Sequence, residues 1–67
     1  MSAGTFTLPS GRSIRTRTKA RYIVVADGRP EVIPYVAFVS NDPEVAQQRR
    51  IVNLDIVLDT HTGEVVR

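Results

Sequence analysis

The sequence predicts a small α+β domain: a mostly antiparallel β-sheet, or a partly closed barrel, with one short helix. Short runs rich in valine, isoleucine and threonine are separated by turn residues, as in antiparallel β-proteins. One segment, beginning near Asn41, carries the signals that start a helix. Because the chain has 67 residues, 42% of them hydrophobic, and no cysteine, we expect a single domain over residues 1–67 without disulfides.

The first third of the chain predicts strands and one turn. Residues 5–8 and 13–21 alternate with the period of a strand and flank the turn residues 9–12, which predicts a β-hairpin. The next run, 22–26, is apolar on both faces and should therefore be covered on both sides. Two alternatives stay open: residues 13–26 form one long bent strand, as in a small barrel, or they form two strands.

The middle of the chain predicts a second hairpin. Asp27-Gly28 is typical of a tight turn, because glycine accepts a positive φ at no steric cost. Residues 29–40 are expected to return as a strand, with Pro34 at an edge or a bulge because proline has no N–H to donate. Within it, residues 35–39 are again apolar on both faces.

The last third of the chain predicts a helix followed by two strands. Asp42 can cap a helix that runs from Pro43 to about Arg50, since aspartate suits the cap and proline the first helical position. Residues 52–59 then alternate as a strand, and residues 65–66 close the chain as a short one. A hairpin loop that ends at Gly63 joins these two strands.

Basic residues gather at the start of the chain. Residues 1–21 contain five basic residues and no acid, whereas residues 22–67 contain four basic and seven acidic ones. Strand residues two apart lie on one face about 6.8 Å from each other, so four of these cations would form a row of about 20 Å. The row could contact nucleic-acid phosphates, dock on an acidic protein surface or be a solvated sheet edge. The candidate nucleic-acid-binding residues are Arg12, Arg15, Arg17, Lys19 and Arg21.

Strands that are apolar on both faces also predict an interface. If Val24 faces the core, its neighbours on the strand face away from it, and one short helix is too small to cover every apolar side chain. A closed barrel or a symmetric oligomer would cover them, and a contiguous exposed apolar area usually marks an interface. We therefore expect a homo-oligomer with these residues at its interface: Tyr22, Ile23, Val25, Tyr35, Val39 and Val57.

The chain offers little for catalysis, metal binding or membrane insertion. Asp55, Asp59, His61 and Glu64 form an acidic cluster with one histidine, but the sequence sets no nucleophile beside that imidazole and too few ligands for a metal. We expect a protein that is not an enzyme and has no cofactor, metal or small-molecule substrate. No apolar run approaches about 20 residues, and we recognise no signal peptide, so we expect a cytoplasmic protein without a membrane contact.

The segment RTRTKARYIVV at residues 15–25, followed by Gly28, Pro30 and Glu31-Val32, resembles small accessory proteins of bacteriophages that infect actinobacteria. Many of those proteins have a basic start, an aromatic residue with a Val/Ile run, and a glycine-containing turn. The resemblance implies a non-catalytic protein in the cytoplasm of an infected host cell, acting on nucleic acid or on host machinery. It implies no particular site residues.

The function that these observations favour is non-enzymatic binding of nucleic-acid phosphates through the cationic strand, by a protein that self-associates. The alternative is a phage-type interaction or host-inhibitory protein that assembles with itself and binds a host protein. The two hypotheses differ in the side chains on which they depend. Replacing the cations by alanine would abolish function under the first, and an aspartate at Ile23 or Val57 would break assembly under the second.

Overall fold

A computed structural model of the chain describes residues 3–51 and 54–66. Within them, two antiparallel sheets form: a two-stranded sheet, β1–β2, and a four-stranded sheet in the order β4-β3-β5-β6. The predicted small α+β class with mostly antiparallel sheet is confirmed, and the described strands do not close into a barrel. The elements in chain order are β1 (Ala3–Thr7), β2 (Ser13–Arg17), β3 (Tyr22–Ala26), β4 (Tyr35–Ser40), α1 (Pro43–Arg49), β5 (Asp55–Asp59) and β6 (Val65–Val66).

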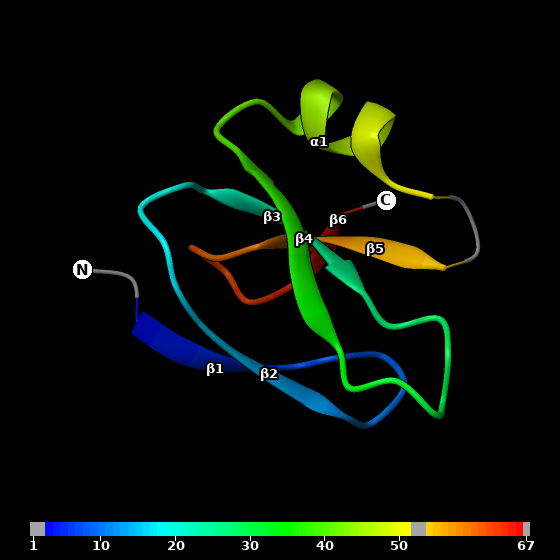
Figure 1. Ribbon diagram of the computed structural model, residues 1–67. Coiled ribbons are helices and arrows are strands. Elements are labelled where there is room, and N and C mark those ends of the chain that lie inside the picture. The colour runs from blue at the N-terminus through cyan, green and yellow to red at the C-terminus, as the bar shows by residue number, and fades with distance from the viewer. Residues whose placement is uncertain (1–2, 52–53, 67) are drawn as a thin grey trace.

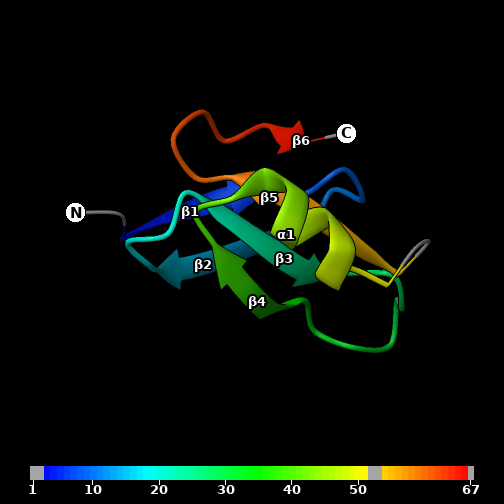
Figure 2. The same ribbon diagram turned by 90° about the horizontal axis from the view of Figure 1, so that it is seen from above.

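The elements stack in three layers. In Figure 1 the four-stranded sheet lies in the middle, with α1 above it and the β1–β2 hairpin below it. Figure 2, seen from above, shows α1 lying across the sheet. The sheet is therefore covered on both faces, by a helix on one and by a second small sheet on the other.

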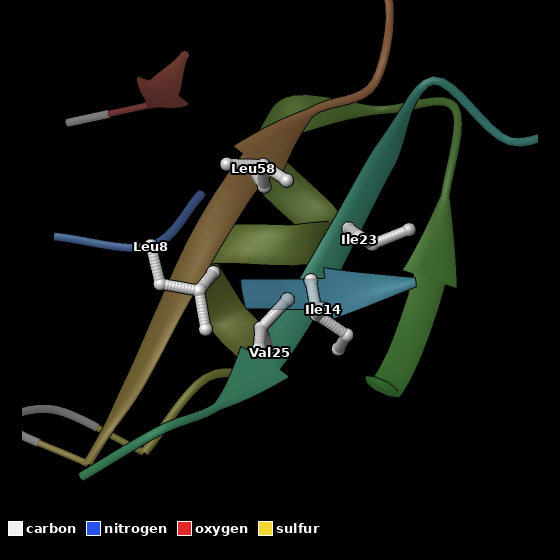
Figure 3. Close-up of a cluster of buried hydrophobic side chains, with 5 residues drawn as sticks. All are labelled: Leu8, Ile14, Ile23, Val25 and Leu58. Carbon is white, nitrogen blue, oxygen red and sulfur yellow. The ribbon is translucent and has the colours of Figure 1, made fainter. Parts of the chain in front are cut away.

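The core between the hairpin and the sheet is built from aliphatic side chains of both. Figure 3 shows that they point toward one another from the hairpin, β3 and β5. Burying each such side chain stabilises the fold by about 1.5–3 kcal/mol. The buried cluster consists of Leu8, Ile14, Ile23, Val25 and Leu58, with Phe6, Val36, Ile56 and Val65 packed against it.

The helix covers the opposite face of the sheet with a small contact. Its buried residue, Ala46, packs with Val24 of β3 and Val57 of β5. Asp42 caps the helix, because its Oδ1 accepts a hydrogen bond of 2.9 Å from the backbone N–H of Glu44. The predicted cap is confirmed, and the helix ends at Arg49, one residue before the predicted end.

Three residues expected at an oligomer interface lie in the core instead. Ile23 and Val25 are 0% exposed and Val57 is 1% exposed. The expectation that they face outward is wrong, because it assumed one covering element. The hairpin covers Ile23 and Val25, while the helix covers Val57 on the other face of the sheet.

The predicted tight turn at Asp27-Gly28 is also wrong. Residues 27–34 form a longer loop, and β4 begins only at Tyr35. Gly28 does not have a positive φ, unlike Gly11 and Gly63. A side chain at Gly28 would bring its Cβ within 2.5 Å of the Cα of Leu54, so glycine is required here by a close backbone approach.

Candidate nucleic-acid interface

The β1–β2 hairpin turns one face to the core and the other to solvent. Its register places Thr5 opposite Arg15 and Thr7 opposite Ser13, and side chains alternate along each strand. Phe6 and Ile14 therefore point into the core. We call the solvent side of the hairpin its outer face; it consists of the exposed side chains of Thr5, Thr7, Ser13, Arg15 and Arg17.

Three cations at the hairpin are exposed and form no ion pair with the residues that the structure describes. Arg15 and Arg17 stand two apart on β2, about 6.8 Å from each other along the strand, and Lys19 follows in the connection to β3. The two ion pairs among residues 3–51 and 54–66 involve other arginines. No acidic residue precedes Asp27 in the sequence, so the hairpin itself is purely cationic.

Arg12, a predicted phosphate contact, is instead used to hold the fold together. Its guanidinium pairs with the carboxylate of Asp27, whose side chain is 5% exposed. It also donates hydrogen bonds of 2.6 Å to the Val32 carbonyl and 3.0 Å to the Arg29 carbonyl. The hydroxyl of Ser10 donates to the second carboxylate oxygen of Asp27 at 2.6 Å. These bonds fasten the hairpin turn to loop 27–34, so Arg12 has few donors left for a ligand.

Arg21 is likewise engaged inside the protein. Its Nε and Nη2 donate to Oδ2 of Asp59 at 3.3 and 3.2 Å, and its guanidinium lies 5.3 Å from the centre of the Tyr22 ring. The expected four-residue cationic row is wrong in its extent, because β2 ends at Arg17 and residues 18–21 connect it to a different sheet. The surviving row consists of Arg15 and Arg17, with Lys19 beyond the strand end.

Asp59 is a buried carboxylate that is held in its charged form. Burial raises its pKa, but several interactions outweigh this effect, so the pKa lies below the usual 3.8. They are the hydrogen bonds from Arg21 and from the backbone N–H groups of His61 and Thr62, together with the charge of Arg21. The same pairing raises the pKa of Arg21. Asp59 therefore links the start of β3 to the β5–β6 turn.

The two aspartates of the acidic cluster have structural roles in the part of the chain that the structure describes. Asp55 is buried, and its Oδ2 accepts a hydrogen bond of 2.9 Å from the backbone N–H of Ile51. His61 and Glu64 are exposed in and beside the β5–β6 turn. Among residues 3–51 and 54–66, no three histidine or acidic side chains are grouped so that they could hold a metal ion.

Exposed large apolar side chains gather along one edge of the main sheet. Tyr35 and Val39 of β4 are 56% and 44% exposed, and Val32 and Ile33 lead into that strand. Strand β4 lies at the end of the sheet order, so its outer edge has no neighbouring strand among those described. Of the predicted interface residues, Tyr35 and Val39 are thus accessible, whereas Tyr22 is half-buried against the core beneath the helix.

Comparison of the chain with protein-family models, with curated protein sequences and with solved structures gave no match. In the described part of the chain, no helix is long and apolar enough to cross a membrane. The resemblance to phage accessory proteins stays a prediction.

Proposed function

We propose that this protein binds nucleic acid through the outer face of the β1–β2 hairpin and the adjacent Lys19, with Arg15, Arg17 and Lys19 as phosphate contacts. The observation that carries the proposal is that the cations near the hairpin fall into two groups, those paired with a carboxylate and those that are not. Arg12 and Arg21 are neutralised by Asp27 and Asp59, whereas these three are exposed without a carboxylate partner among the described residues.

The chemistry of the outer face suits phosphate. Each guanidinium offers a planar fork that can donate two hydrogen bonds to one phosphate, and serine and threonine hydroxyls donate to phosphate oxygens as well. The hairpin is anchored by the buried side chains of Leu8 and Ile14 and by the Arg12 contacts at its turn. A ligand would therefore meet a surface that is already ordered, which lowers the entropy cost of binding.

The proposal is tested by two double variants that change the net charge equally. Arg15→Ser/Arg17→Ser removes the outer-face arginines, while Arg29→Ser/Arg49→Ser removes two exposed arginines elsewhere; each lowers the formal charge from +2 to 0. Fluorescence anisotropy with labelled oligonucleotides at low salt should show binding that only the first variant loses. Equal losses in both variants would mean that net charge, and not this face, governs binding.

A second candidate function is self-association along the β4 edge. Residues 32–41 contain no charged residue in a chain that is 24% charged, and an uncharged edge strand readily pairs with another. A second copy is the matching occupant, because this uncharged apolar edge complements itself. The register between β3 and β4 shifts by one residue at Ala37, which confines regular pairing to short stretches. Self-association would place two hairpins on one assembly and increase avidity for a polymer.

Light scattering over a range of protein concentrations tests self-association. The molar mass should rise toward that of a dimer, and Val39→Lys should restore the monomer, because a lysine on an edge strand opposes pairing. Thr7→Lys adds the same charge on the hairpin and serves as the control. A monomer at every concentration would rule out this candidate and leave the hairpin proposal untouched.

A further inference from the structure

We infer that the ligand of the outer face is the major groove of B-form DNA, which the β1–β2 hairpin enters as a two-stranded ribbon; this rests on the proposed function. The major groove is about 12 Å wide and admits a two-stranded β-ribbon. The hairpin is such a ribbon, because β1 and β2 pair only with each other among the described strands.

The layer arrangement lets the ribbon project far enough from the main sheet to enter the major groove. Packed sheets lie about 10 Å apart, so the hairpin projects about 10 Å from the wider four-stranded sheet on which it packs. The major groove is about 8.5 Å deep. The ribbon can therefore reach the floor of the groove before the broader sheet meets the phosphate walls.

The side chains of the outer face are of the types that contact base edges and groove walls. Arg15 and Arg17 can donate to the phosphates that line the groove, and the hydroxyls of Thr5, Thr7 and Ser13 can donate to or accept from base edges. Lys19 is exposed beyond the end of β2, where it would contact the backbone beside the groove. The outer face thus combines base-edge and phosphate contacts on one ribbon.

The same face is poorly suited to single strands and to duplex RNA. Single-strand binding relies on aromatic side chains on which bases stack, and none of the five outer-face side chains is aromatic. Phe6, the aromatic residue of the hairpin, packs against the core. Duplex RNA has a deep, narrow major groove that side chains cannot read. The chemistry of the outer face therefore favours duplex DNA.

The test compares the full chain on four labelled ligands of equal length: duplex DNA, single-stranded DNA, duplex RNA, and duplex DNA whose cytosines carry glucosylated hydroxymethyl groups. These groups fill the major groove and leave the phosphates in place. We expect the unmodified duplex to bind best and the glucosylated duplex to bind at least about tenfold more weakly, which is the effect of losing one good side-chain contact to a base. Netropsin, which occupies the minor groove, should leave binding unchanged.

A variant provides an independent test of groove entry. Thr5→Phe/Thr7→Phe keeps the charge, changes only exposed strand positions and uses a residue that strands favour. It should weaken duplex binding at least about tenfold by widening the ribbon and should preserve or strengthen single-strand binding through stacking. Circular dichroism shows whether the variant is folded.

The outcomes separate the two proposals. If the glucosylated and unmodified duplexes bind alike, groove entry is overturned while phosphate binding by the outer face stands. If single strands bind as well as the duplex, groove entry is likewise overturned. If none of the four ligands binds at low salt, the proposed function itself is wrong.

Discussion

At the scale of the residue, the cations near the hairpin have two different roles that their spacing in the sequence does not reveal. Arg12 and Arg21 find carboxylates 15 and 38 residues away, Asp27 and Asp59. Alternation identified Arg15 and Arg17 as members of one strand face, and the structure confirms it. Pairing across such distances depends on tertiary contacts, so the sequence could not separate the paired arginines from the exposed ones.

Asp59→Asn should change how stability depends on pH. Because the pKa of Asp59 lies below its unfolded value near 3.8, its charge stabilises the fold fully above that pH. The stabilisation is lost as the pH falls through the lower, folded pKa. The variant should therefore be less stable at pH 7 and should lose less of its remaining stability between pH 5 and pH 2. Urea unfolding across this range measures the difference, and parallel pH profiles would show that Asp59 adds no such stabilisation.

Arg12→Lys should destabilise the protein although the charge is kept. A lysine cannot reach the Asp27 carboxylate and the carbonyls of Val32 and Arg29 together, because it lacks the planar fork. We expect a loss of about 1–3 kcal/mol in the free energy of unfolding. Arg15→Lys, at an exposed position, is the control and should change stability by no more than about 0.5 kcal/mol. Equal stability of both variants would contradict the role given to Arg12.

At the scale of the element, sequence periodicity predicted most of the strands and the helix, but not which elements pack against them. The alternation of residues 13–17, the Asp42 cap and the strand at 22–26 are as predicted. A run that is apolar on both faces shows only that both faces are covered, and here the chain's own hairpin and helix cover them. The loop at 27–34 was missed because the need for Gly28 comes from the distant Leu54.

The hairpin and β3 should be coupled through Ile23. Ile23→Ala should lower the free energy of unfolding by about 2–4 kcal/mol, because it leaves a cavity between the two sheets. Val39 faces Ile23 across the β3–β4 ladder but is 44% exposed, so Val39→Ala should cost less than about 1 kcal/mol. Chemical denaturation measures both. Similar losses of unfolding free energy at the two positions would contradict the position of Ile23 in the core.

At the scale of the whole molecule, the fold keeps its acidic residues out of the hairpin layer. The hairpin contains no acid, and all seven acids of the chain follow it in sequence, in or around the main sheet and helix. The three-layer stack turns the hairpin's outer face away from the sheet that supports it (Figure 1). Fold class was predictable from composition and pattern. The layer order was not, because it depends on which face of the sheet each covering element occupies.

The most direct test of the central claim is the salt dependence of duplex binding. Each phosphate neutralised contributes about −0.9 to the slope of log affinity against log salt, so three contacts predict a slope of about −2.7. Arg15→Ser/Arg17→Ser should reduce the magnitude of that slope by about two, whereas Arg29→Ser/Arg49→Ser should leave it unchanged. A slope near zero, or one that the outer-face variant does not alter, would contradict nucleic-acid binding through the outer face of the hairpin.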